Sequence, residues 1–243
     1  MAPVSHVERE IDIATRDGVM NTFVVHPGSS GPHPVVLFYM DAPGKREELH
    51  DMGRRLADAG YYVMLPNLYY RRVREFVLTA DGREEMMAHM NSLTNAMVCE
   101  DTAAMLDYAA ADGAASDGGV GCVGYCMSGP FAFAAAAAFS DRMRAAASVH
   151  GVRLHTDAAD SPHLNADKIS AELYFACAET DHWAPPELVD ALDAHLRASG
   201  CRYRIEWYPG TQHGFVFPQR PAYVEPAAER HWQALLDLFG RNL

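Results

Sequence analysis

The sequence predicts an α/β fold in which a mostly parallel central sheet, opening with an N-terminal antiparallel hairpin, carries helices on both faces. Strand-like and helix-like stretches alternate almost from end to end of the 243 residues, which is the pattern of parallel strands joined by crossover helices. Inner strand candidates such as residues 35–39 are continuous apolar runs, as expected for strands buried on both faces. No repeat, linker or shift in composition divides the chain, so we expect one domain over residues 1–243.

Each expected element begins or ends at a recognisable local signal. The turn at residues 16–18 joins the two strands of the hairpin. Gly60 and Gly200 end helices, and Pro66 ends a strand. The expected strands, in chain order, lie at residues 10–14, 19–25, 35–39, 61–65, 119–124, 145–149, 171–178 and 203–208. The expected helices lie at residues 45–59, 98–111, 127–139, 186–198 and 221–239.

Two segments show no helical or strand periodicity. Residues 150–169 are expected to form a loop. Residues 67–95 mix tyrosines, arginines and methionines and directly follow the end of a strand. Because ligands bind at the carboxyl ends of the strands in sheets of this kind, we expect residues 67–95 to border the mouth of a pocket.

The composition is that of an acidic, soluble chain. Twenty lysines and arginines against 32 aspartates and glutamates give a net charge of −12, which repels phosphate backbones and anionic lipids. The longest apolar run, residues 131–139, is far shorter than the roughly 20 residues that cross a bilayer. The start, MAPVSHVERE, lacks the apolar centre of a signal peptide, and five cysteines without CxxC spacing fit reduced thiols. We expect a cytoplasmic monomer or small homo-oligomer that binds neither nucleic acid nor membrane.

The segment GCVGYCMSG indicates a nucleophile. It joins a short apolar strand directly to an alanine-rich helix, and small residues, Gly124 and Ser128, stand two positions before and after Cys126. This is the pattern of a nucleophile elbow, with cysteine at the apex. The helix N-terminus would stabilise the thiolate, and the N–H of Met127 would face the oxyanion. Ser128 is the rival nucleophile, and a buried structural cysteine is the non-catalytic alternative.

An acid and a base follow the nucleophile in the order that elbow-bearing hydrolases use. Asp181 and His213 each lie in a segment that comes after a later expected strand, so both can meet Cys126 at one sheet edge. Glu179 is a competing acid and His182 a competing base. The sequence contains no HxH, HExxH or Cys/His cluster, so we expect no metal ion and no cofactor.

The motifs GYCMSG, ETDHWAP and GTQHGF, in that order, resemble those of the dienelactone hydrolase family, as does PNLYYR at residues 66–71. The resemblance covers nearly the whole chain. It implies an α/β-hydrolase fold and an enzyme that opens lactone or ester bonds with a Cys-Asp-His triad. By motif match, these roles fall on Cys126, Asp181 and His213.

The resemblance also suggests residues that tune the thiol and contact the substrate. The family keeps an acidic residue after the third strand, close to the cysteine, and Asp41 takes that place here with a shorter side chain than the prototype's glutamate. Ala42 would then supply the second oxyanion N–H, beside that of Met127. Tyr125 and Trp183, next to the nucleophile and the acid, are further candidates for substrate contact.

One family feature is missing. Prototype enzymes hold a substrate carboxylate partly with a serine and an arginine shortly after the catalytic histidine, and Gly214 and Phe217 take those places here. Arginines of the irregular segment are candidates for a replacement clamp, Arg72 among them: Arg71, Arg72, Arg74 and Arg83. Their alternative role is that of a solvated basic loop. The departure implies a more apolar ester or lactone than the family name suggests.

The function expected from the sequence is hydrolysis of a lactone or carboxylic ester, of the carboxymethylenebutenolidase type, through a thioester acyl-enzyme. The nearest alternative is the same triad acting on another acyl compound, such as a thioester or an unactivated ester. A third possibility, from a different class, is a non-catalytic receptor that binds a small molecule on a hydrolase fold.

Overall fold

The computed structural model describes residues 5–29 and 31–243. The expectation of no signal peptide rests in part on the first four residues, which lie outside the described part. Two compact units make up the chain, Met1–Val120 and Gly121–Leu243, and each is described by itself. The expectation of a single domain stays a prediction.

The first unit contains the antiparallel hairpin that the sequence predicts. Its strands are β1 (His6–Thr15), β2 (Gly18–Pro27), β3 (Val35–Tyr39) and β4 (Tyr62–Pro66), arranged in the order β1-β2-β4-β3. β1 pairs antiparallel with β2, and β2 antiparallel with β4. β3 and β4 are parallel and buried along their whole length, which explains their continuous apolar sequence.

Three helices accompany these strands: α1 (Glu47–Asp58), α2 (Arg83–Asn91) and α3 (Asn95–Ala111). α1 packs on β2 and β4, and the side chain of Thr94 caps α3 by accepting from the N–H of Met97 at 3.2 Å. The expectation that residues 67–95 lack a helix is wrong, because α2 lies within them. His89 is the buried residue of α2, so this helix has no apolar stripe from which periodicity could predict it.

The second unit contributes β5 (Val120–Tyr125), β6 (Met143–Val149), β7 (Glu172–Thr180) and β8 (Arg202–Gln212), in that order across the sheet. β6, β7 and β8 pair in parallel, as the alternating sequence predicts. β8 continues four residues past the expected end at Tyr208, with a register shift opposite residues 178–180 of β7. The carboxyl ends of these strands lead into Cys126, Asp181 and His213.

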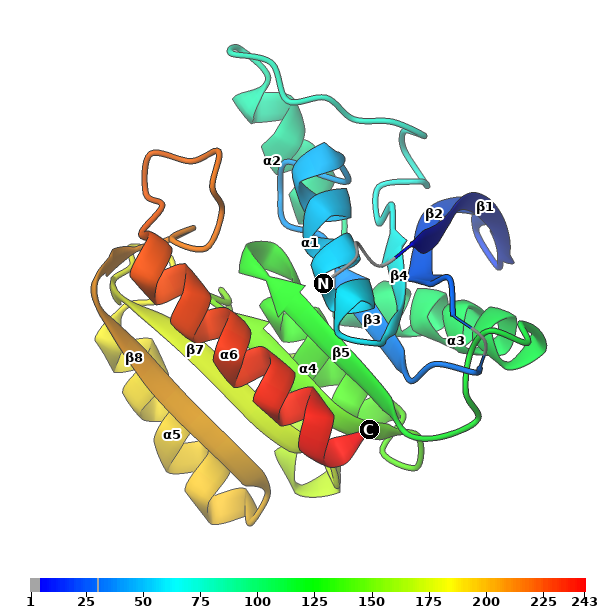
Figure 1. Ribbon diagram of the computed structural model, residues 1–243. Helices are drawn as coiled ribbons and strands as arrows, with labels where there is room; N and C mark the ends of the chain where they lie inside the picture. Colours follow the sequence, from blue (N-terminus) through cyan, green and yellow to red (C-terminus); the bar gives the residue numbers. More distant parts are fainter. Residues whose placement is uncertain (1–4, 30) are drawn as a thin grey trace. The chain divides into compact units, whose positions relative to one another are not determined.

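The helices of the second unit are η1 (Cys126–Ser128), α4 (Gly129–Ala138), η2 (Pro162–Lys168), α5 (Pro186–Ser199) and α6 (Glu225–Asn242). Figure 1 shows α6 across one face of strands β5–β8 and α4 and α5 on the other. The short 3₁₀ segment η2 interrupts the stretch expected as a loop, and the last helix begins at Glu225 rather than at residue 221. The predicted mostly parallel sheet with an antiparallel hairpin and helices on both faces is confirmed. In the described part of the chain, no helix has the length and apolar character needed to cross a bilayer.

Candidate active site

Cys126 occupies a sharp turn between β5 and η1. Its φ of 55° lies in the left-handed region, which non-glycine residues rarely adopt, and its side chain is partly accessible to solvent. Strained backbone of this kind is typical of a nucleophile elbow, because the turn projects its apex side chain away from the sheet. The backbone therefore has the conformation that the sequence predicts for a nucleophile.

The residues around Cys126 show why the elbow needs small neighbours. A Cβ on Gly124 would lie 1.9 Å from the carbonyl oxygen of Ser128, and a Cβ on Gly129 would lie 2.6 Å from the Cα of Gly151. Neither contact is possible for real atoms, so both positions require glycine. Ser128, the rival nucleophile, is fully buried, which leaves Cys126 as the accessible group of the turn.

Asp181 and His213 form a short, well-oriented pair in the second unit. The Nδ1 atom of His213 lies 2.7 Å from Oδ2 of Asp181. The other carboxylate oxygen, Oδ1, accepts from the backbone N–H groups of Trp183 at 2.8 Å and Ala184 at 3.3 Å. Both oxygens of this buried carboxylate are therefore occupied, and the histidine presents Nε2 on its opposite side.

The environment of His213 favours its protonated form. Burial lowers the pKa of the imidazole, but the hydrogen bond with Asp181 and the attraction of the imidazolium to the sulfur of Cys126 and to the Asp181 carboxylate outweigh burial and raise the pKa to about 9. Nε2 of His213 is buried and lacks a partner of hydrogen-bonding geometry within the described residues. A loose contact between nucleophile and base is common in enzymes without bound substrate. The arrangement allows a proton to pass from the thiol to the histidine.

The competing residues of the acid loop have other surroundings. The carboxylate of Glu179 is exposed and accepts from the N–H of Gly210 at 2.7 Å, so it links the ends of β7 and β8. His182 is exposed and contacts the ring of Trp183 edge-on. The ring of Trp183 is itself 44% exposed, whereas Tyr125 is fully buried and its hydroxyl lies 3.2 Å from Nε2 of His231.

His150, directly after β6, is a residue that the sequence did not single out. Its ring centroid lies 4.7 Å from that of His213, it is 1% exposed, and neither ring nitrogen has a hydrogen-bond partner among the described residues. Burial, together with the nearby His213 and Arg220, lowers its pKa well below the ordinary value. A neutral imidazole therefore packs against the catalytic base candidate. His150 is one of twelve histidines in the chain, and no sequence motif around it could have identified it.

Arg220 is a second residue that sequence reasoning missed. Its guanidinium carbon lies 4.6 Å from the centre of the Phe217 ring, and its Nη1 reaches the backbone of Gly214 so closely that a Cβ there would lie 3.1 Å away. Arg220 and His213 both line a hollow of about 450 Å³ in the second unit. Positions 214 and 217 thus lack a cation, yet Arg220 brings one beside them.

In the first unit, Asp41 and Ala42 lie in the turn after β3. Asp41 is fully buried, and both of its oxygens face the guanidinium of Arg46, at 2.5 and 3.4 Å. The carbonyl of Ala42 accepts from the hydroxyl of Tyr69 at 2.8 Å. Gly44 completes the turn with φ 87° and an N–H bonded to the carbonyl of Asp41. The approach of this turn to Cys126 stays a prediction, as does the oxyanion role of Met127, which is buried in the second unit.

Three of the four arginines proposed as a replacement clamp bind side chains of the first unit. Arg71 pairs with Asp101 and Asp17 at 2.7–2.8 Å. Arg74 binds a carboxylate of β1, and the Nε of Arg72 donates to Nδ1 of His89 at 3.0 Å. Arg83 is exposed at the start of α2. The position of this segment relative to the nucleophile stays a prediction.

Comparisons with known proteins identify the family and the fold of this chain. The model of the "Dienelactone hydrolase family" matches residues 20–243. A "Putative carboxymethylenebutenolidase" of Methylorubrum extorquens is 27% identical over 95% of this chain and 79% of its own length, and one of Synechocystis is 27% identical over 91% of each chain. The crystal structure of a "Putative Dienelactone Hydrolase" from Klebsiella pneumoniae superposes with a TM-score of 0.88 at 24% identity, over 97% of this chain and 99% of the other. The fold shared with that structure is the α/β-hydrolase fold.

Proposed function

Because this chain belongs to the dienelactone hydrolase family, we propose that it hydrolyses a lactone or carboxylic ester through the thiol of Cys126, with His213 as base and Asp181 as its orienting acid. The observation that carries the proposal is the 2.7 Å contact between Asp181 and His213, in which His213 also interacts with Cys126, a cysteine held at φ 55°. A nucleophile, a base and an orienting acid are the three parts that acyl transfer needs.

The first half-reaction acylates the thiol. Nε2 of His213 takes the proton of Cys126, and Sγ attacks the carbonyl carbon to form a tetrahedral intermediate. The intermediate collapses by breaking the bond to the ester or ring oxygen, which receives the proton from His213. The product is a thioester on Cys126 and a free hydroxyl, attached to the same molecule if the substrate is a lactone.

The second half-reaction releases the acid. His213 now accepts a proton from water, whose oxygen attacks the thioester carbonyl. Collapse of this second intermediate breaks the C–S bond, and His213 returns its proton to the thiolate of Cys126. Asp181 holds Nδ1–H throughout and stabilises the imidazolium that forms in each half.

The N–H groups of Met127 and Ala42 are the proposed oxyanion donors. Loss of one such donor typically lowers the rate by about 10²–10³, so the turn that carries Ala42 has to be rigid. The ion pair between Asp41 and Arg46 lies at the start of this turn. We therefore assign Asp41 the task of holding the turn, with tuning of the thiol as its second proposed task.

Arg220 bears on which substrate charge the site accepts. The sequence alone favours a neutral acyl group, since positions 214 and 217 lack a cation. The guanidinium of Arg220 beside Gly214 brings carboxylate-bearing esters and lactones within the range of the site, because a planar guanidinium suits bidentate binding of a carboxylate. Comparing kcat/KM for a matched pair of neutral and anionic substrates shows whether the site prefers a neutral acyl group or a carboxylate-bearing one.

The proposed function is tested by turnover of a chromogenic short-chain ester before and after thiol alkylation. We expect alkylation and Cys126→Ala each to abolish hydrolysis, with the fold intact by circular dichroism. Cys201→Ala is the matched control, because Cys201 is also partly accessible but lies at the start of β8, away from the elbow. The control variant should keep full activity and its sensitivity to alkylation. Near-normal turnover by Cys126→Ala would contradict the proposal and direct attention to Ser128.

A further inference from the structure

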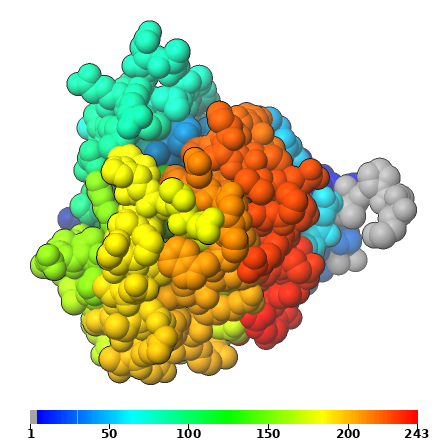
Figure 2. Space-filling model, turned by 90° about the vertical axis from the view of Figure 1, so that its left-hand side faces the viewer, coloured from blue at the N-terminus to red at the C-terminus, as the bar shows by residue number. Residues whose placement is uncertain are grey.

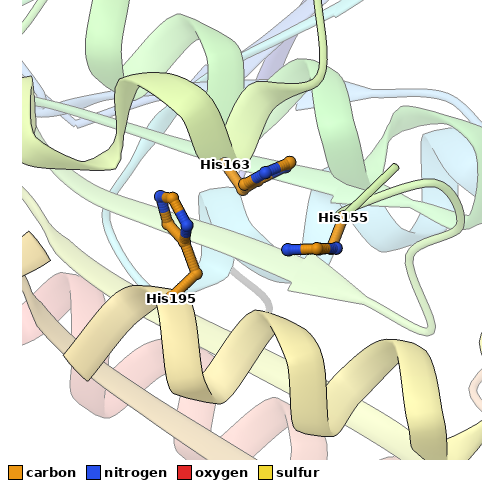
Figure 3. A group of neighbouring side chains, drawn as sticks. All are labelled: His155, His163 and His195. Carbon is orange, nitrogen blue, oxygen red and sulfur yellow. The ribbon is translucent and has the colours of Figure 1, made fainter. Parts of the chain in front are cut away.

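Three histidines from separate segments meet in the second unit, outside the triad. His155 lies in the segment after β6, His163 in η2 and His195 in α5, and Figure 3 shows their rings turned toward one another. One ring nitrogen from each lies within 4.8 Å of the other two. Their separations along the chain match no metal-binding motif, so the expectation of no metal, which rested on sequence spacing, did not consider this cluster.

The rings lie close together, and a hydrogen bond holds one of them. The centroids of His155 and His163 are 3.9 Å apart in a stacked arrangement, and those of His163 and His195 are 4.6 Å apart at a nearly perpendicular angle. Nδ1 of His163 lies 2.7 Å from Oγ of Ser161, and that hydroxyl oxygen also accepts from the N–H of Thr156 at 3.0 Å. A fixed partner on one nitrogen is what orients a metal-binding histidine and leaves its other nitrogen, here Nε2, as the ligand.

The cluster can be reached from the solvent. His155 and His195 are partly exposed, which provides a path for an ion to enter. The surface that contains α5 faces the viewer in Figure 2, in yellow and orange.

We propose that His155, His163 and His195 form a binding site for a divalent transition-metal ion of the zinc class. Three neutral imidazoles are typical ligands of Zn²⁺, Co²⁺, Ni²⁺ and Cu²⁺, whereas Mg²⁺ and Ca²⁺ require oxygen ligands. Tetrahedral zinc, with Zn–N bonds of about 2.0–2.1 Å, places its ligand nitrogens about 3.3 Å apart. Because the rings of His155 and His163 are stacked, binding requires the partly exposed rings of His155 and His195 to rotate. The fourth position is left to water.

A bound ion would cross-link α5 to the segment that follows β6. This segment begins beside the nucleophile, because the N–H of Val152 donates to the carbonyl of Cys126 at 3.1 Å. His155 lies only three residues farther along. The ion therefore stabilises the folded state, since it binds the native arrangement of three segments and not the unfolded chain.

The test is a titration of metal-free, tag-free protein with Co²⁺, followed by its visible d–d absorption, and then with Zn²⁺ in competition. Cys126→Ala serves as the background so that the reactive thiol cannot act as a ligand. We expect one ion per chain, an absorption typical of tetrahedral nitrogen and oxygen ligands, and a rise in Tm with Zn²⁺. His195→Gln and His155→Gln, both at partly exposed positions, should weaken binding by at least about tenfold, the lower end of the loss caused by changing residues that only orient metal ligands, and should abolish the rise in Tm.

His182→Gln is the matched control, because His182 is an exposed histidine of the same unit outside the cluster. This variant should bind both ions as the background protein does. Circular dichroism verifies that each variant is folded. Unchanged binding by His195→Gln and His155→Gln, a cobalt–thiolate charge-transfer band, or no binding at millimolar metal would overturn the proposal. None of these outcomes bears on ester hydrolysis.

Discussion

Replacement of Asp181 by asparagine probes the base and its orientation together. In the native protein, Oδ1 of Asp181 accepts two backbone N–H groups, from Trp183 and Ala184, while Oδ2 faces Nδ1 of His213. In Asp181→Asn the carbonyl oxygen keeps the two N–H groups, because they can only donate. The amide nitrogen then faces His213, and since it also donates, it forces the hydrogen of the imidazole onto Nε2. Nε2 can no longer accept the proton of Cys126.

The magnitude follows from this change of tautomer. The amide of a triad aspartate typically costs about 10⁴ in kcat, which corresponds to about 5.4 kcal/mol at 1.36 kcal/mol per factor of ten. The variant also loses a contribution that raises the pKa of His213 to about 9. Burial, which lowers that pKa, is then less strongly opposed, so the pKa should fall.

The assay measures kcat for a chromogenic ester against pH and follows the His213 ring by NMR. Glu179→Gln is the matched control, because its exposed carboxylate bonds a backbone N–H and does not touch the histidine; its rate should stay within about threefold of the parent, as expected for a group remote from the reacting atoms. A loss of only two- to threefold in Asp181→Asn, roughly 0.4–0.7 kcal/mol, would show that Asp181 does not orient His213. An unchanged pKa of His213 would show the same.

Three further changes test other parts of the site. Gly124→Ala should prevent a stable fold or lower the free energy of unfolding by more than about 4 kcal/mol, because its Cβ would meet a carbonyl oxygen at 1.9 Å; a thermal melt like that of the parent would contradict the elbow. Arg220→Gln should lower kcat/KM by about tenfold, or about 1.4 kcal/mol, for a carboxylate-bearing ester and leave its neutral analogue unchanged; equal effects on both would exclude a charge-recognition role. His150, whose folded pKa is depressed, binds a proton below about pH 6.5 only when unfolded, so stability falls as pH falls below that value, by up to about 1.4 kcal/mol per unit. His150→Gln should reduce this slope in urea titrations from pH 6.5 to 5, whereas the exposed-histidine variant His182→Gln should not.

Strong periodicity and turn signals made most of the fold predictable. β3 is found with the bounds that its apolar run predicts, and Gly200 ends α5 with φ 72° in the left-handed region. α2 could not be predicted in this way because its surface is mixed and only His89 is buried. The extra length of β8 depends on pairing with β7 through Thr180↔Gln212, which local sequence does not encode.

The candidate site could also be predicted only in part. Cys126, Asp181 and His213 each follow a strand, so topology alone predicts that they share an edge of the sheet. His150 and Arg220 lie near His213 through the paths of two loops, and no spacing rule links positions 150, 213 and 220. The histidine cluster likewise depends on η2, which lies within a stretch that we expect from the sequence to be a loop.

Passage of an acyl group through the sulfur of Cys126 is tested most directly by trapping that group. The protein is mixed with a β-lactone, whose ring-opened acyl group leaves a thioester slowly, and acid-quenched samples are mapped by peptide mass spectrometry. We predict a mass increase equal to that of the lactone on the peptide that contains Cys126, located to its sulfur, and none in Cys126→Ala. An acyl group on Ser128 or another residue, or equal labelling of Cys126→Ala, would contradict acyl transfer through Cys126.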